Sequence, residues 1–313
     1  MVTRDEAMWA YRMILGREPE SELAIKGAQR AANVPALRRA FLKSKEFGRQ
    51  ALLQDLPRVW VIAQVMRGKR LMWIDLGDRF VSRGCLFDSY ESIESAFVAS
   101  HLRPEAVFVD VGANLGWFSL LASTLVGPRG RIHAFEPRAD TVEYLEKTID
   151  LNRLGDQITI YRYGLSDAEG QANLVWPKGT DNPGHSFLSI QPSGTEMESQ
   201  LVELRPLDAL ALERVDFMKV DVEGAELRVF RGARETLARC RPVILAELYP
   251  DMLEDVSGTN TDAFFCFFRE IGYRCFIVDA KRNAEEITSF PANWGKELVN
   301  VGLIPIERTG LPD

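Results

Sequence analysis

Apolar strand-like runs alternate with helix-like segments between residues 106 and 271, and this alternation most constrains the fold. The strand-like runs are AVFVDV, RIHAF, QITIYRYGL, VDFMKVDV and PVILAEL, and all but QITIYRYGL are followed by a helix-like segment. Nearly continuous apolar strands joined by helices are typical of a parallel sheet that is covered by helices on both faces. The sequence therefore predicts an α/β fold of this kind.

Two further strand-like runs, residues 273–278 and 297–306, have no helix between them. We expect them to form an antiparallel hairpin at one end of the sheet. Residues 177–199 are rich in Gly, Pro, Ser and Asn, which predicts a long loop. A loop of this length inside a compact domain is usually functional.

The chain divides into three predicted parts. Residues 1–55 carry apolar side chains at helical spacing and predict a small all-helical module. Residues 56–89 alternate between apolar and polar side chains and contain Gly77 and Gly84, which predicts a β-ribbon or linker. Residues 90–313 form the predicted main domain, which opens with a helix in ESIESAFVASHL.

Composition excludes several classes of protein. A net charge of −7 argues against nucleic acid as a partner, because phosphate binding needs clustered Lys and Arg. No apolar segment has the length of a membrane span or the form of a signal peptide, and the four cysteines lack CxxC pairing, so we expect a soluble, cytoplasmic protein. The run FFCFF at residues 264–268 predicts core packing, with a further face for self-association in a homo-oligomer.

The strongest functional signal is the turn in DVGANLGWF. A strand that ends in Asp110, a turn with Gly112 and Gly116, and a following helix open a ligand crevice at the carboxyl edge of a parallel sheet. A dinucleotide fingerprint needs a glycine at the middle position, where this chain has Asn114. A ligand without a pyrophosphate fits better, and S-adenosylmethionine is such a ligand.

Residues after the next two strands complete the predicted cofactor site. Glu136 lies 20 residues beyond Gly116, where its carboxylate can accept hydrogen bonds from both ribose hydroxyls. Ser166 and Asp167 follow the third strand and are expected to meet the adenine edge. A sheet with tight turns and no cofactor is the alternative.

The stretch FMKVDVEGAEL supplies the predicted reacting groups. Asp221 ends the fourth strand beside the first, so we expect it at the methyl-donor end of the cofactor, as a cofactor contact and a catalytic base. Lys219 shares its strand face and is expected to pair with a carboxylate or to reach solvent. Glu223 is left open between base, metal ligand and helix cap, whereas Glu226 is expected to start a helix.

Further candidates lie outside that stretch. Glu247 on the fifth strand could join Asp221 and Glu223 in a Mg²⁺ site, although a site without metal is favoured. His185 lies in the predicted loop and is a second candidate base, or an exposed loop residue. The pair Tyr90–Glu91 could line the pocket for the acceptor or for the methionine part of the cofactor, or belong to a helix cap.

These residues carry a resemblance to a known family. The segments FVDVGANLGWFSLLAS, GRIHAFEP, NRLGDQITIYRYGLSDAEG and MKVDVEGAELRVFRGARETLARCRPVILAEL are similar to sequences of the FkbM family of S-adenosylmethionine-dependent methyltransferases. The resemblance runs from residue 90 to residue 306. It implies a class I methyltransferase fold, which is a Rossmann-like, seven-stranded, mostly parallel sheet with an antiparallel end pair. It also implies an O-methyltransferase that acts on a sugar hydroxyl or a polyketide-type natural product.

The amino-terminal YRMILGREPESE and FLKSKEF resemble a second, helical module that accompanies bacterial cell-surface and glycan-related proteins, although the Gly and Trp that usually follow its LGR-x-P segment are absent here. Together the two resemblances indicate an O-methyltransferase that acts on a glycan or sugar-containing metabolite in polysaccharide biosynthesis. One alternative is a nucleotide-cofactor oxidoreductase, which Asn114 disfavours. The other is a non-catalytic binding module in surface-glycan assembly, which the acidic residues disfavour.

Overall fold

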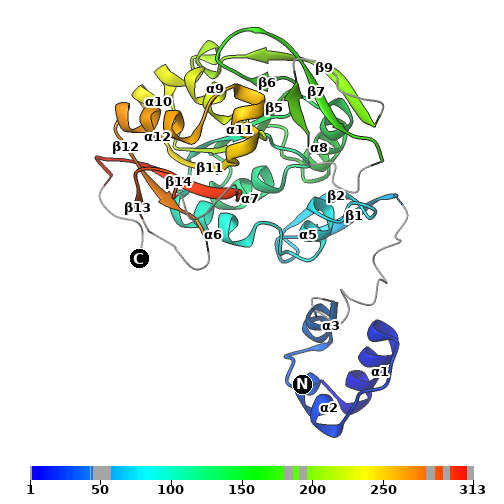
Figure 1. Cartoon of the computed structure of the whole chain (residues 1–313). Helices are drawn as coiled ribbons and strands as arrows, with labels where there is room; N and C mark the ends of the chain where they lie inside the picture. The colour runs from blue at the N-terminus through cyan, green and yellow to red at the C-terminus, as the bar shows by residue number, and fades with distance from the viewer. Residues whose placement is uncertain are drawn as a thin grey trace.

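The computed structural model describes residues 2–42, 44, 58–179, 186–189, 196–279, 286–291 and 297–308 (Figure 1). Its centre is an eight-stranded sheet, in which five neighbouring strands run parallel and β14 runs antiparallel to both of its neighbours. From one edge to the other the strands are β13 (Glu286–Ile287), β12 (Tyr273–Ile277), β14 (Val299–Pro305), β11 (Val243–Leu248), β10 (Phe217–Val220), β3 (Val107–Val111), β4 (Arg131–Phe135) and β5 (Ile158–Tyr161). The predicted antiparallel end is confirmed, and the short edge strand β13 adds an eighth strand to the predicted seven.

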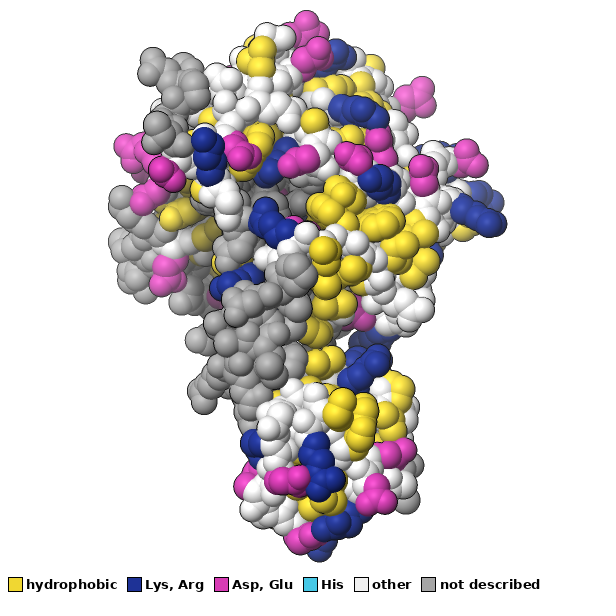
Figure 2. Space-filling model, turned by 90° about the vertical axis from the view of Figure 1, so that its right-hand side faces the viewer, with side chains coloured by type: hydrophobic (Ala, Val, Ile, Leu, Met, Phe, Trp, Pro, Cys, Tyr) yellow, Lys and Arg dark blue, Asp and Glu magenta, His cyan; other side chains and the backbone are white. Residues whose placement is uncertain are grey.

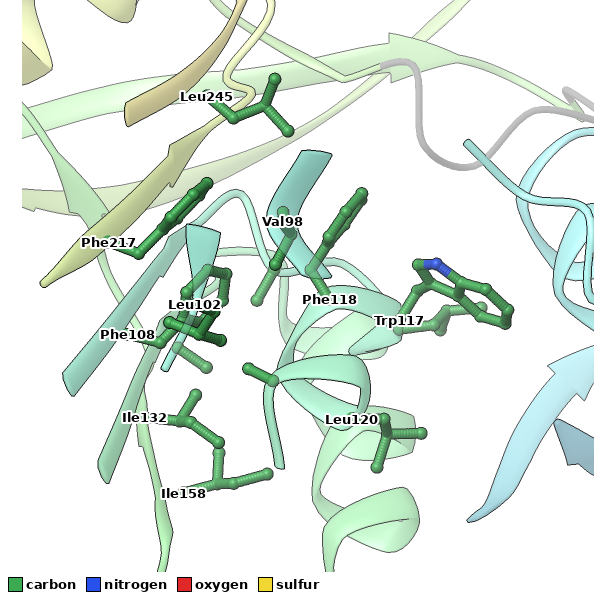
Figure 3. Packing of buried hydrophobic residues seen from close by; sticks show 14 of the residues in the cluster. Val98, Leu102, Phe108, Trp117, Phe118, Leu120, Ile132, Ile158, Phe217 and Leu245 are labelled. Atoms are coloured by element: carbon green, nitrogen blue, oxygen red, sulfur yellow. The ribbon is translucent and has the colours of Figure 1, made fainter. Parts of the chain in front are cut away.

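Each face of this sheet has its own apolar core, because successive side chains of a strand point to opposite faces. Phe108 and Phe217 belong to the core on one face, which Figure 3 shows, whereas Val109 and Met218 belong to the core on the other. The first face is covered by α6 (Ser92–His101), α7 (Trp117–Leu125) and α8 (Ala139–Leu151), and the second by α9 (Glu226–Arg231), α10 (Arg234–Cys240), α11 (Pro250–Ser257) and α12 (Thr261–Glu270). The same alternation turns Lys219 toward the α7 face.

The structure tests two predictions about the helices of the second face. The helix-like segment that follows VDFMKVDV is broken into α9 and α10 at Gly232, where a Cβ atom would lie 1.9 Å from the carbonyl oxygen of Ser166. The four phenylalanines of residues 264–268 are buried in the core, as predicted. They leave no exposed aromatic face on α12 for self-association.

A second sheet of four strands was not predicted. Its order is β6 (Gly164–Leu165), β9 (Met197–Arg205), β7 (Gly170–Pro177) and β8 (Phe187–Ser189). The prediction of a loop at residues 177–199 is therefore wrong for residues 187–189 and for the first residues of β9. Four buried side chains form the small apolar core of this sheet, namely Leu174, Trp176, Val202 and Leu204. So few apolar positions give little signal in a sequence.

The predicted ribbon is a hairpin of β1 (Trp60–Val65) and β2 (Arg70–Asp75), followed by a helix, α5 (Val81–Leu86). The prediction of a ribbon was wrong for α5. Its first turn is held by the buried carboxylate of Asp78, which accepts hydrogen bonds from the backbone N–H groups of Phe80, Val81 and Ser82. Apolar side chains of the hairpin join the core on the α8 face of the large sheet.

The amino-terminal residues form three helices with a core of their own. They are α1 (Arg4–Leu15), α2 (Glu22–Gln29) and α3 (Val34–Leu42). Thr3 and Glu6 form a capping box at the start of α1, and Gly16 ends the helix in a left-handed conformation. The boundaries of the three predicted parts of the chain stay a prediction. Among the described residues, no helix is both long and apolar enough to cross a membrane.

Candidate active site

The turn after β3 is shaped by close backbone packing. Gly112 has a φ of 79°, and a Cβ atom there would lie 1.9 Å from the carbonyl oxygen of Asp221. The N–H groups of Gly112 and Ala113 both donate to the carbonyl oxygen of Phe135 at the end of β4. Asn114 is also left-handed, with a φ of 50°. Only glycine fits at residue 112, because any side chain would meet the backbone of Asp221, just beyond β10.

Glu136 fixes the next part of the site. Its Oε2 accepts a hydrogen bond of 2.9 Å from the N–H of Asn114, and its Oε1 accepts one of 2.9 Å from the N–H of Arg138. Burial raises the pKa of Glu136 to about 7, although both backbone hydrogen bonds act in the opposite direction. The carboxylate is therefore held in one orientation and titrates near neutral pH.

Glu136 and the glycine turn line a cavity, which we call the first cavity. The large sheet contributes the floor of this cavity, and strands β7 and β8 of the small sheet contribute Leu174 and Leu188 to its wall. The remaining lining residues are Val111, Gly112, Asn114, Phe135, Glu136, Pro137, Thr141, Gly164, Leu165, Ser186, Asp221, Val222, Glu223 and Ala225. A cavity with apolar walls and a few polar groups is typical of a small-molecule site.

Some of the residues predicted for the cofactor support this cavity without lining it. Asp110 is buried, and its Oδ2 accepts a 2.6 Å hydrogen bond from the Ser119 hydroxyl on α7, while burial raises its pKa. Gly116 caps α7, and a Cβ atom there would lie 2.5 Å from the Leu145 side chain. Both residues shape the turn from behind.

Ser166 and Asp167 are placed differently from the prediction. The third strand of the large sheet, β5, ends at Tyr161, and the following Gly164–Leu165 pairs with β9 in the small sheet. Leu165 lines the cavity, whereas the Ser166 hydroxyl is buried and donates to the Asp167 carboxylate at 3.1 Å. Neither Ser166 nor Asp167 is among the described residues that line the cavity.

A second cavity adjoins the first. The two share Asn114, Asp221 and Glu223 on their walls. The other lining residues of the second cavity come from α5, from the start of α6 and from β11, and they are Phe80, Val81, Gly84, Ser89, Tyr90, Glu91 and Glu247. The shared carboxylates therefore lie where one bound molecule can meet another.

Lys219 organises the carboxylates of the second cavity. Its Nζ lies 2.7 Å from Asp221 Oδ2 and 3.8 Å from Glu91 Oε2, and it sits over the Phe118 ring at 4.5 Å. Lys219 is only 5% exposed, so it does not reach solvent. Burial acts to lower its pKa, but Asp221, Glu91 and Asp110 raise the pKa above its ordinary value. Lys219 is a permanent cation that pairs with Asp221.

Asp221 and Glu247 form an unequal pair. Burial acts to raise the pKa of Asp221, but Lys219 and a hydrogen bond with Glu247 hold that pKa below its usual value. Burial and the negative charge of Asp221 raise the pKa of Glu247 well above its usual range. A proton shared by this pair therefore favours Glu247, which donates it to the Asp221 carboxylate in the hydrogen bond between them.

The remaining candidates have distinct places. Glu223 has left-handed backbone, with a φ of 47°, and lines both cavities. Glu226 begins α9, as predicted, and its Oε1 accepts a 2.9 Å hydrogen bond from the N–H of Gly224. His185 lies outside the described residues. Within the described part of the chain, no three His, Cys, Asp or Glu side chains are arranged to hold a metal ion, so the alternative of Asp221, Glu223 and Glu247 as a Mg²⁺ site gains no support.

Residues 110–275 match the family described as "Methyltransferase FkbM domain". The matched segment covers more than half of the chain. The chain belongs to the FkbM methyltransferase family. Its strand order, with β14 inserted antiparallel between β11 and β12, is the class I methyltransferase fold that the resemblance implied. The family uses S-adenosylmethionine as its methyl donor.

Named relatives of this chain come from several organisms. AMB antimetabolite synthetase AmbE of Pseudomonas aeruginosa is 29% identical over 70% of this chain and 12% of its own length. Hexuronic acid methyltransferase AglP of Haloferax volcanii is 31% identical over 44% of this chain and 54% of its own length. The chain thus spans less than two thirds of either relative. A solved structure of methyltransferase FkbM from Methylobacillus flagellatus is 16% identical, with a TM-score of 0.39 over 64% of this chain and 43% of that one.

The first cavity of the FkbM methyltransferase fits S-adenosylmethionine. Gly112 and Asn114 line the cavity beside Glu136, whose fixed carboxylate would accept hydrogen bonds from a ribose diol. Phe135, Leu165 and Leu174 supply apolar walls for a flat ring. Sequence reasoning missed Leu174 and Leu188 because it predicted no second sheet, and it missed Phe80 because it predicted no α5.

Proposed function

We propose that this FkbM methyltransferase is an S-adenosylmethionine-dependent O-methyltransferase that methylates a hydroxyl of a sugar, glycan or glycosylated metabolite. The observation that carries the proposal is the position of Asp221 on the walls of both cavities, with its carboxylate held ionised by Lys219. A hydroxyl is a weak nucleophile at neutral pH. A base placed where the two cavities meet can accept its proton and make the oxygen more nucleophilic.

Residues of the first cavity would hold the cofactor. Gly112 and Asn114 would shape the turn against it, and Glu136 would accept hydrogen bonds from the ribose. When bound, S-adenosylmethionine supplies an electrophilic methyl group. Asp221 then lies at the edge of the cofactor cavity that faces the acceptor.

Residues of the second cavity would prepare the acceptor. The Asp221 carboxylate accepts the proton of the acceptor hydroxyl, Lys219 keeps that carboxylate ionised, and protonated Glu247 orients it by donating a hydrogen bond. Glu223 completes the wall beside Asp221. No metal ligand set is needed for this arrangement.

The sugar part of the proposal has separate support. AglP, a relative, is named as a methyltransferase of a hexuronic acid. The amino-terminal helices resemble a module found with glycan-related proteins of bacteria. Cys85, Cys240, Cys266 and Cys275 are free thiols, which fits a bacterial cytoplasm.

Two measurements test the proposal. Calorimetry should show micromolar binding of S-adenosylmethionine and none of NAD(H), and mass spectrometry of a panel of sugar nucleotides, oligosaccharides and lipid-linked glycans should show the gain of one methylene mass.

Variants test the residues of the proposed mechanism. Asp221→Asn should lower turnover by about a hundredfold or more without abolishing cofactor binding. Glu247→Gln should keep most of the turnover, because an amide can still donate to Asp221, whereas Glu247→Leu should not. Full turnover by Asp221→Asn would remove this residue from the mechanism.

A further inference from the structure

The second cavity has an aromatic side chain at its mouth that the proposed chemistry does not use. Phe80 lines this cavity and is 55% exposed, whereas the other phenylalanines in the described chain are buried or half-buried. Its backbone is held at the start of α5, because the Phe80 N–H donates to the buried Asp78 carboxylate at 2.9 Å. An exposed aromatic ring beside hydrogen-bonding side chains is a surface for a bound ring.

The titratable side chains on the described lining of the second cavity are acidic. Glu91, Asp221, Glu223 and Glu247 line the cavity, and its described lining contains no Lys, Arg or His. Lys219, which does not line the cavity, is buried and pairs with Asp221 and Glu91. The described lining therefore offers hydrogen-bond acceptors but no cationic side chain to a bound molecule.

These two observations define which acceptors fit. The positive C–H groups on the apolar face of a sugar ring are attracted to the negative face of an aromatic ring. Carboxylates accept hydrogen bonds from sugar hydroxyls, but they repel a carboxylate, sulfate or phosphate on the same sugar, and that repulsion is strong where water is scarce.

We propose that the second cavity takes an uncharged sugar ring, with Phe80 stacked on its apolar face and the carboxylates on its hydroxyls, and that it excludes acidic sugars. This inference rests on the proposed function. It separates this chain from its relative AglP, whose name assigns it a hexuronic acid.

Matched acceptor pairs test the charge selection. The probes are methyl glycosides of glucose, galactose and mannose, each compared with the glycoside of its uronic acid, at saturating S-adenosylmethionine. We expect kcat/KM for at least one neutral sugar to exceed that of its uronic acid partner by about a hundredfold, the size of effect that close like charges produce. Equal or better methylation of a uronic acid would overturn the inference, and so would methylation of no neutral sugar in the panel.

Variants test the role of Phe80. Phe80→Ala should raise the KM for the preferred neutral sugar by about tenfold, which is the order of an aromatic contact, and Phe80→Trp should restore it. The control is Leu201→Ala, which removes an equally exposed apolar side chain, 60% exposed, on β9 away from the cavity lining. An unchanged KM in Phe80→Ala would refute the stacking.

Failure of the inference differs from failure of the proposed function. A protein that binds S-adenosylmethionine and methylates uronic acids keeps the proposed function and loses the inference. A protein that does not bind S-adenosylmethionine loses both.

Discussion

At the scale of single residues, four residues that line the two cavities have left-handed backbone. Glu91, Gly112, Asn114 and Glu223 have φ values of 39°, 79°, 50° and 47°. Such conformations cost free energy for residues other than glycine, and they persist where the surrounding structure holds them in place. The sequence indicated the strained position at Gly112, because glycine is the usual residue there, but nothing in it marked Glu91 or Glu223.

Gly112→Ala should separate close packing from backbone strain. Gly127 is the control, because it also has a positive φ, of 68°, but a Cβ atom there would meet nothing within 4 Å. Gly127→Ala should cost about 1 to 2 kcal/mol of stability through its backbone alone. Gly112→Ala must also displace the Asp221 carbonyl oxygen, so it should cost more and weaken S-adenosylmethionine binding at least about tenfold. Thermal unfolding and calorimetry measure both; equal effects of the two variants would contradict the argument.

Glu136 predicts a pH dependence of cofactor binding. Its pKa of about 7 in the folded protein means that the carboxyl is mostly protonated at pH 6. The ionised form is the better acceptor for a ribose diol, so binding should release a proton and the Kd should rise up to about tenfold from pH 8 to pH 6. Calorimetry in buffers of different ionisation enthalpy measures the released proton.

Glu226 offers a matched control for that prediction. Burial also raises its pKa to about 7, but Glu226 is not among the described residues that line either cavity. Glu136→Gln should flatten the pH dependence of the Kd, and Glu226→Gln should leave it unchanged.

Glu136 and Glu226 also make the stability of the fold depend on pH. Each pKa is higher in the folded state than the ordinary value of 4.5, so the folded protein binds more protons than the unfolded chain between pH 4.5 and about 7. Their contribution therefore destabilises the protein progressively as pH rises through that window, and fully above it.

At the scale of elements, the strength of the apolar signal decided what could be predicted. The strands of the large sheet are buried on both faces, so their sequences are continuous apolar runs and their existence was clear. The small sheet buries only a few side chains, and β8 has three residues, so composition favoured a loop. Helix α5 depends on the Asp78 cap, a contact that no periodicity shows.

The residues of the candidate site could be predicted where they follow strands that are clear in the sequence. Glu136 and Asp221 follow recognisable strands, and both line the cavities as their positions indicated. Ser166 was misplaced because the boundary of β5 was read four residues too late, beyond its end at Tyr161. The protonation of Glu247 depends on how near Asp221 lies across the sheet, which the spacing of residues along a chain does not give.

The hairpin of β1 and β2 should depend on the side chain of Asn152, which lies at the carboxyl end of α8. Asn152 donates to the Leu71 carbonyl oxygen at 2.6 Å and accepts from the Leu71 N–H at 2.9 Å, so it satisfies the edge of β2. Asn152→Leu removes both bonds and should cost about 1 to 3 kcal/mol. Lys147→Ala, on the exposed side of α8, is the control and should cost less than about 0.5 kcal/mol. Chemical denaturation measures the difference, and similar costs would count against this role for Asn152.

At the scale of the whole molecule, both cavities open at the carboxyl edge of one sheet. The alternation of side chains along β10 buries Phe217 and turns Lys219 to the same face, and Asp221 follows beyond the end of the strand. Residues 217–221 thus supply a core side chain, a counter-ion and the proposed base. On the face shown in Figure 2, Lys, Arg, Asp and Glu side chains are interspersed and form no single basic stripe.

The apolar clusters predict that the catalytic part works without the amino-terminal helices. In the described part of the chain, the cluster of α1, α2 and α3 contains no residue beyond Leu42, and the clusters around the two sheets contain none before Trp60. A chain of residues 58–313 should therefore fold, bind S-adenosylmethionine with a Kd within about twofold of the full chain, and methylate a small sugar at the same rate. A chain of residues 77–313 is the control: it also lacks the hairpin, whose Met72 and Ile74 are fully buried, and it should lose cooperative unfolding. Loss of cofactor binding in the longer of these two truncated chains would show that the helices belong to the catalytic domain.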